Sequence, residues 1–133
     1  MKFTRIVYGI AAAYGLLVLP PLYFLVDRIG REAPPPIAHP EFFYGFLGLA
    51  ILWQIIFVLI AKDPVRYRPF MPLAILEKFV YSIPVIILYS QGRLHPNILK
   101  SAMGDPILGI LFIAAYFQSG RAAHAIAANN RTQ

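Results

Sequence analysis

Glu77 is the residue best placed to do chemistry in this sequence, because it is an acid inside an otherwise apolar segment. The segment is PLAILEKFVYSIPVIILYS, residues 72–90, and a helix starting at Pro72 puts Glu77 about 8 Å from its beginning. A carboxylate at that depth in a membrane is costly and requires a partner. Tyr81, four residues further on, shares the same helix face, so the two side chains form a candidate polar line.

The partner of Glu77 decides between two interpretations. Lys62, Arg66 and Arg68 precede the segment, and an arginine is the favoured partner because its guanidinium can form two parallel hydrogen bonds with a carboxylate. Lys78 is predicted to point away, since adjacent helix residues do not face each other. A paired Glu77 is a structural ion pair, which the sequence favours. An unpaired Glu77 is a protonatable or ligand-binding acid, and this alternative stays open.

Three further polar or aromatic residues are candidates for a site. Asp105 precedes a proline, so it either caps a helix or, if that helix begins near Ile98, lies about two turns inside a membrane and can bind a proton or cation. Gln54 lies near the middle of an apolar run, where it forms an interhelical hydrogen bond or contacts a ligand in a lipophilic pocket. Trp53 would be a wall of that pocket.

Other chemistry is disfavoured. His39 lies near Asp27 and Glu41, but no second histidine stands at metal-ligand spacing, so the sequence predicts no metal site. Cysteine is absent, which excludes thiol catalysis and thiolate ligands. No hydrolase, metalloprotease, P-loop or haem motif is present, so we predict no catalytic residue and favour a non-enzymatic role.

The elements that must position these residues are apolar runs. The chain is 59% hydrophobic and 14% charged, whereas a soluble domain is about a quarter charged. The runs cover residues 5–26, 41–61, 72–90 and 98–119, each near the roughly 20 residues that span a bilayer. The sequence therefore predicts an all-α integral membrane four-helix bundle that forms a single domain over residues 1–133.

Prolines interrupt three of these runs. Pro20 and Pro21 lie in the first, Pro84 in the third and Pro106 in the fourth. Each removes a backbone hydrogen bond and bends a helix. Two interpretations stay open: the bends splay the bundle and open a gap toward the outer leaflet, or they only shape the packing.

The basic residues predict an orientation. Four helices place both termini and the second loop on one face, and that face has more lysine and arginine than the other, which predicts cytoplasmic termini. This asymmetry accounts for the net charge of +6, so the charge does not require nucleic-acid binding as its explanation. The first face carries Lys2, Arg5, Lys62, Arg66, Arg68, Arg121 and Arg131, and the second carries Arg28, Arg31, Arg93 and Lys100.

Two stretches resemble a known group. KDPVRYRP with LEK, residues 62–69 and 76–78, and DRIGREAPPPIAHPEFFYG, residues 27–45, resemble small uncharacterised bacterial inner-membrane proteins. These have a DPxRYRP loop before helix three and a Glu-Lys pair that opens it. The group is loosely similar to DoxX-type four-helix proteins, some of which accompany quinone-linked oxidoreductases. The resemblance implies a multi-pass protein of the bacterial inner membrane and supplies no functional residues.

Two functions follow as hypotheses. The favoured one is a non-catalytic accessory or lipid-binding subunit of a larger membrane assembly. The alternative is a small proton-coupled carrier or lipophile-binding protein that uses Glu77. No cofactor is predicted, although a bound lipid or quinone is compatible with either. The expected partners are the lipid bilayer and other membrane subunits or further copies of the chain, and not nucleic acid.

Overall fold

Within residues 1–131, the part of the chain that the computed structural model describes, every regular element is a helix. Four segments are long and apolar enough to cross a membrane: Lys2–Phe24, Pro40–Lys62, Arg68–Ser90 and Pro96–Ala122. Each overlaps one of the four apolar runs, so the prediction of an all-α chain with four helices of spanning length is confirmed.

The elements follow one another along the chain with short connections. Their bounds are α1 Lys2–Val18, the 3₁₀ helix η1 Pro20–Phe24, α2 Val26–Glu32, α3 Pro40–Lys62, the 3₁₀ turn η2 Arg68–Phe70, α4 Met71–Ser90, α5 Pro96–Ala102 and α6 Gly104–Arg131.

The prolines have different local effects from one another. The first run does not continue as one α-helix to Val26; α1 ends at Val18, and the chain passes through η1, whose first residues are Pro20 and Pro21. Proline has no N–H for the α-helical bond, so the tighter 3₁₀ turn takes over. Pro84, in contrast, lies inside α4 without ending it.

The fourth run departs most from the prediction of a helix over 98–119. It is divided into α5 and α6 by Met103, three residues before Pro106, which cannot donate to the carbonyl of Ala102. At the other end, α6 does not stop before Gly120 but continues to Arg131. The alanine-rich stretch after Gly120 is a strong helix former, which explains the extension.

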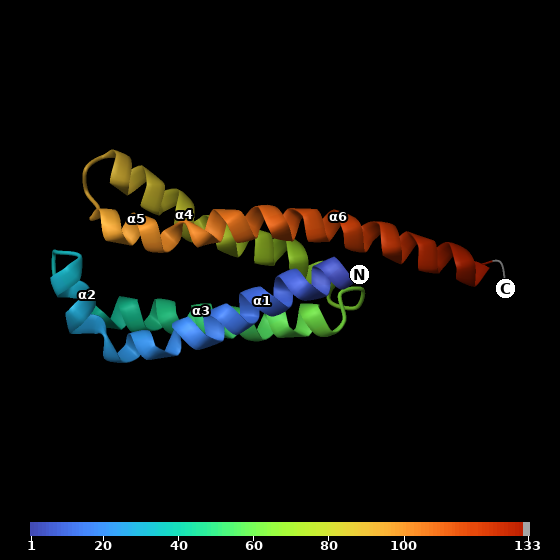
Figure 1. Ribbon diagram of the computed structural model, residues 1–133, viewed down its shortest axis with the longest axis horizontal. Helices are drawn as coiled ribbons and strands as arrows, with labels where there is room; N and C mark the ends of the chain where they lie inside the picture. The colour runs from blue at the N-terminus through green and yellow to red at the C-terminus, as the bar shows by residue number, and fades with distance from the viewer. Residues whose placement is uncertain (132–133) are drawn as a thin grey trace.

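The helices are arranged in two pairs, α1 with α3 and α4 with α6, and the pairs meet mainly through α1 and α6 (Figure 1). The pairs lie close together near the N-terminus and diverge toward α2 and α5 (Figure 1). The Asn97 side chain donates a hydrogen bond to the Glu32 carbonyl at 3.2 Å, so α2 touches α5 across the diverging ends. This shape is compatible with the splayed arrangement, one of the two interpretations that the prolines left open.

The core holds the two pairs together at the closed end. Tyr8 of α1 stacks on Phe112 of α6 with ring centroids 4.1 Å apart, and Phe57 of α3 packs edge-on against both rings. All three side chains are fully buried, as is Ala74 of α4, so each of the four long helices contributes to one cluster. Burial of such aromatic area is the main source of packing energy between helices.

The N-terminus, the α3–α4 loop and the C-terminal part of α6 lie at the same end of the molecule (Figure 1). The comparison of lysine and arginine between the two faces assumed that these segments lie at one end of the molecule. Insertion in a membrane, and the side on which the termini lie, stay predictions.

Candidate functional site

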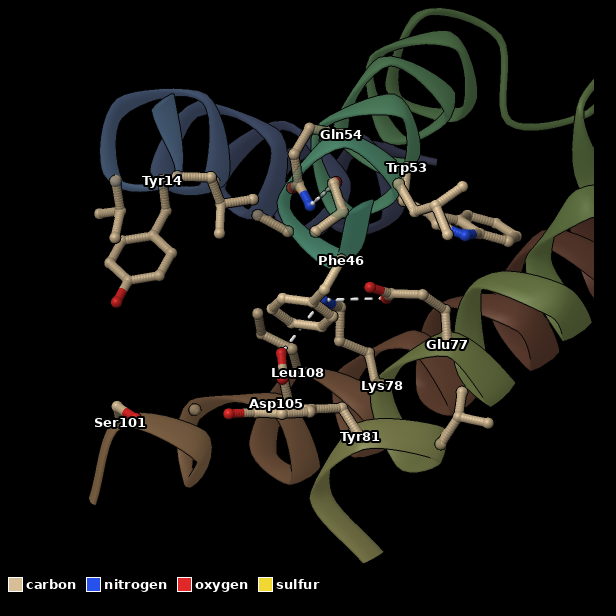
Figure 2. Close-up of a pocket in the computed structure, with 18 residues that line it drawn as sticks. Tyr14, Phe46, Trp53, Gln54, Glu77, Lys78, Tyr81, Ser101, Asp105 and Leu108 are labelled. Atoms are coloured by element: carbon tan, nitrogen blue, oxygen red, sulfur yellow. Dashed lines mark hydrogen bonds and ion pairs between the residues drawn. The ribbon is translucent and has the colours of Figure 1, made fainter. Parts of the chain in front are cut away.

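A cavity of about 340 Å³ lies between the two helix pairs, beyond the aromatic core. Figure 2 shows its walls converging from both pairs. It is lined by Ala11, Tyr14, Gly15, Val18 and Leu19 from the first run, Phe46, Leu49, Ala50, Trp53 and Gln54 from α3, Glu77, Lys78, Val80 and Tyr81 from α4, and Ser101, Gly104, Asp105 and Leu108 from α5 and α6.

An ion cluster forms the polar wall of this cavity. The Lys78 ammonium lies 3.0 Å from Glu77 Oε2 and donates a hydrogen bond of 3.1 Å to Asp105 Oδ1 (Figure 2). The Lys78 side chain is 7% exposed, and those of Glu77 and Asp105 are 18% and 27% exposed. The ammonium also lies 5.1 Å from the centre of the Phe57 ring, within the range of a cation–π contact.

The prediction that Lys78 points away from Glu77 is therefore wrong. Adjacent residues do leave the helix in different directions, but the flexible four-carbon stem of lysine brings the ammonium back to the carboxylate. The distance between Lys78 Nζ and Glu77 Oε2 is that of an ion pair, but the angles are not those of a hydrogen bond to this buried oxygen.

The loop arginines do not pair with Glu77, contrary to the favoured sequence interpretation. The Arg68 guanidinium lies over the Tyr116 ring, 4.0 Å from its centre. Arg66 lies 5.6 Å from the Tyr67 ring centre. Their position in and beside the α3–α4 loop puts both outside the cavity lining.

Asp105 matches neither sequence interpretation fully. It is the second residue of α6 and its carboxylate accepts from Lys78, so its hydrogen bond links two helices and does not cap its own. It is inside the spanning-length segment Pro96–Ala122, as the buried alternative required, and is partly exposed to the cavity. The positive end of the α6 dipole also favours a carboxylate there.

The cluster lies near the middle of the apolar segments. The midpoint of Arg68–Ser90 is residue 79, so Glu77 and Lys78 are within two residues of it, about 3 Å along the axis. The midpoint of Pro96–Ala122 is residue 109, which puts Asp105 about 6 Å away. Glu77 is thus deeper than its distance from Pro72 indicated, because η2 lengthens the segment at its start.

Gln54 does not form the expected interhelical hydrogen bond with its amide nitrogen. Its Nε2 donates to the Ala50 carbonyl of the same helix at 2.9 Å. The side chain packs directly over Gly15 of α1, where even a methyl group would overlap it. Gly15 therefore provides the space that allows a buried amide between α1 and α3.

Aromatic rings form much of the remaining wall. Phe46 of α3 packs on Tyr81 of α4 with ring centroids 5.1 Å apart, which bridges the two pairs. Trp53 and Tyr14 also line the cavity (Figure 2). An aromatic wall beside carboxylates accommodates apolar and positively charged groups.

Five of the seven candidate residues from the sequence line this one cavity, and the two arginines do not. The five are Glu77, Asp105, Gln54, Trp53 and Tyr81. Lys78 was missed as a site residue, although a lysine near the centre of an apolar run signals a buried charge that needs acids.

Among the residues that the structure describes, no three histidine, cysteine or acidic side chains come together as a metal site. Comparison of the chain with protein-family models, with curated proteins and with solved structures found no match. The kinship indicated by the DPxRYRP loop stays a prediction.

Proposed function

We propose that this chain is a multi-pass protein of the bacterial inner membrane that binds one lipophilic small molecule in the cavity between its helix pairs. The observation that carries the proposal is a cavity with an apolar and aromatic wall and an ion cluster near the centre of the spanning segments. The proposal adopts the lipid-binding part of the favoured sequence hypothesis and the use of Glu77 from the alternative.

The dimensions and composition of the cavity support this function. A volume of about 340 Å³ falls in the range of small-molecule sites, roughly 300–1,000 Å³. Such sites are mostly apolar with a few polar groups that orient the ligand, which describes this lining. Ionisable residues at mid-membrane depth are costly and mark ligand or ion sites in membrane proteins.

The cavity supports binding more directly than catalysis or a purely structural role. The one serine hydroxyl of the lining, that of Ser101, donates to a backbone carbonyl and not to a base, and the Lys78 amine is held in ion pairs by two carboxylates. An accessory role beside other subunits is compatible with ligand binding and is a separate prediction.

Trp53 makes the proposal testable, because it is the sole tryptophan of the chain and lines the cavity. We expect an amphiphile with a brominated eleven-carbon chain, such as bromoundecanol, to quench Trp53 fluorescence in lipid nanodiscs, and the quenching should saturate as the probe concentration rises. The variant Gly104→Leu should abolish the saturable part, since Gly104 lines the cavity and has open space where its side chain would be.

The matched control is Gly45→Leu, because Gly45 also has open space beside it and lies on α3 outside the cavity lining. The Trp53 fluorescence of this variant should be quenched by the probe to the same extent, and as saturably, as that of the unmodified protein. Linear, unsaturable quenching in the unmodified protein, or equal quenching in the two variants, would show that the probes only dissolve in the bilayer and would refute the site.

A further inference from the structure

We infer that the cavity selects a lipophilic monocation, such as an amphipathic amine or quaternary ammonium, and that this cation replaces a proton held by the carboxylates. The inference rests on the proposed function and adds the chemical class of the ligand. It starts from the charges that line the cavity.

The cluster contains two carboxylates and one ammonium. With Lys78 protonated and both Glu77 and Asp105 ionised, its net charge is −1. A charge inside an apolar segment is costly and favours local compensation, because the charged form loses the solvation that water would give it. The cluster therefore requires one further positive charge, either a proton or the charged group of a ligand.

The geometry leaves room for that charge beside both acids. Lys78 is the most buried member and is already engaged by both carboxylates and by the Phe57 ring. The side chains of Glu77 and Asp105 are partly exposed to the cavity, and a carboxylate accepts about four hydrogen bonds in all. A cation entering the cavity thus meets carboxylate oxygens that one lysine does not saturate.

The aromatic wall favours the same class of ligand. Trp53, Phe46 and Tyr81 line the cavity around the acids. Their ring faces attract ammonium groups and hold an apolar chain equally well. An anionic head group would meet two carboxylates, and a neutral one would leave the proton in place and form no ion pair with them.

The exchange is balanced in charge and protons. In the empty site the cluster holds one proton in addition to those of the Lys78 ammonium, and when the cation binds this proton leaves to water. The other titratable groups that face the two acids are Lys78 and Tyr81 from α4 and Tyr14 from α1. Cation binding should consequently weaken as the pH falls, because protons compete for the same carboxylates.

The test compares three probes with the same brominated chain: bromoundecyl-trimethylammonium, bromoundecanol and bromoundecanoate. Their binding to the protein in nanodiscs of neutral lipid is followed by Trp53 quenching. We expect the cation to bind at least about tenfold more tightly than the neutral and anionic probes. We also expect release of about one proton for each cation bound, measured with a pH indicator in weak buffer.

Variants identify the carboxylates responsible. Glu77→Gln and Asp105→Asn should each abolish the proton release and bring the affinity of the cation down to that of bromoundecanol measured on the same variant. The control Glu41→Gln changes an exposed acid on α3 outside the cavity and should retain the proton release and the cation preference. The pH dependence in the unmodified protein tests the same point without any variant.

The outcomes separate this inference from the proposed function. Saturable binding of all three probes with equal affinity and no proton release would overturn the cation preference and leave a lipophile site in place. Tighter binding of the anion would overturn it as well. Absence of saturable binding for every probe would refute the proposed function itself.

Discussion

Lys78 is the residue on which the site depends most, because it is the only cation that contacts both carboxylates in the part of the chain that the structure describes. The sequence identified Glu77 and Asp105 individually from their apolar surroundings. It did not show that they share a partner, since α4 and α6 come together through packing that no local pattern encodes. The rule that neighbours on a helix diverge also failed, because a long side chain can reverse its direction.

We predict that Lys78→Met destabilises the protein by roughly 3 kcal/mol, because removing one member of a buried ion pair leaves uncompensated charge. The triple variant Lys78→Met/Glu77→Gln/Asp105→Asn should recover most of this loss, since no charge is then left buried. The free energy of unfolding in mild detergent measures both effects.

The control for this comparison is Lys100→Met, which removes an exposed lysine of α5 and should cost under about 0.5 kcal/mol. If the triple variant were as unstable as Lys78→Met alone, the loss would come from altered packing and the ion cluster would not explain it.

At the scale of elements, hydrophobic run length located the four segments of spanning length but not the points where the helices break. The runs gave four segments because apolar length is a local property of the chain. The interruption at Met103 and the change to a 3₁₀ helix at Pro20 depend on how each proline is accommodated, whereas Pro84 stays within a continuous α4. The same residue type therefore has three outcomes.

These breaks matter for the site. The break at Met103 starts α6 immediately before Asp105, so the acid lies in a first helical turn and faces Lys78 across the cavity. A continuous helix from Ile98 would have removed that positive helix end from the carboxylate. The two helix pairs diverge and leave room for the cavity. This arrangement depends on tertiary packing, so it could not be predicted from the lengths of the apolar runs.

At the scale of the whole molecule, the placement of both termini and the α3–α4 loop at one end makes the charge asymmetry meaningful. We predict that this end faces the cytoplasm. The chain contains no cysteine, so single cysteines can be introduced without a background. Ala38→Cys, in the α2–α3 connection, should react with an impermeant thiol reagent added outside spheroplasts.

Val65→Cys, in the exposed α3–α4 loop, should be protected in intact spheroplasts and react once they are lysed. Labelling of Val65→Cys and protection of Ala38→Cys in intact spheroplasts would reverse the proposed orientation, while the helix count would be unaffected.

The central claim is that one small lipophile occupies the cavity between the helix pairs, and native mass spectrometry of protein released from mild detergent tests it most directly. We expect a single small-molecule adduct on the unmodified protein and on Gly45→Leu, and its loss from Gly104→Leu, because Gly104 lines the cavity and has open space beside it for the added side chain. The same spectra would reveal any companion subunit. An unmodified protein without an adduct, or an adduct equally abundant on both variants, would contradict the claim.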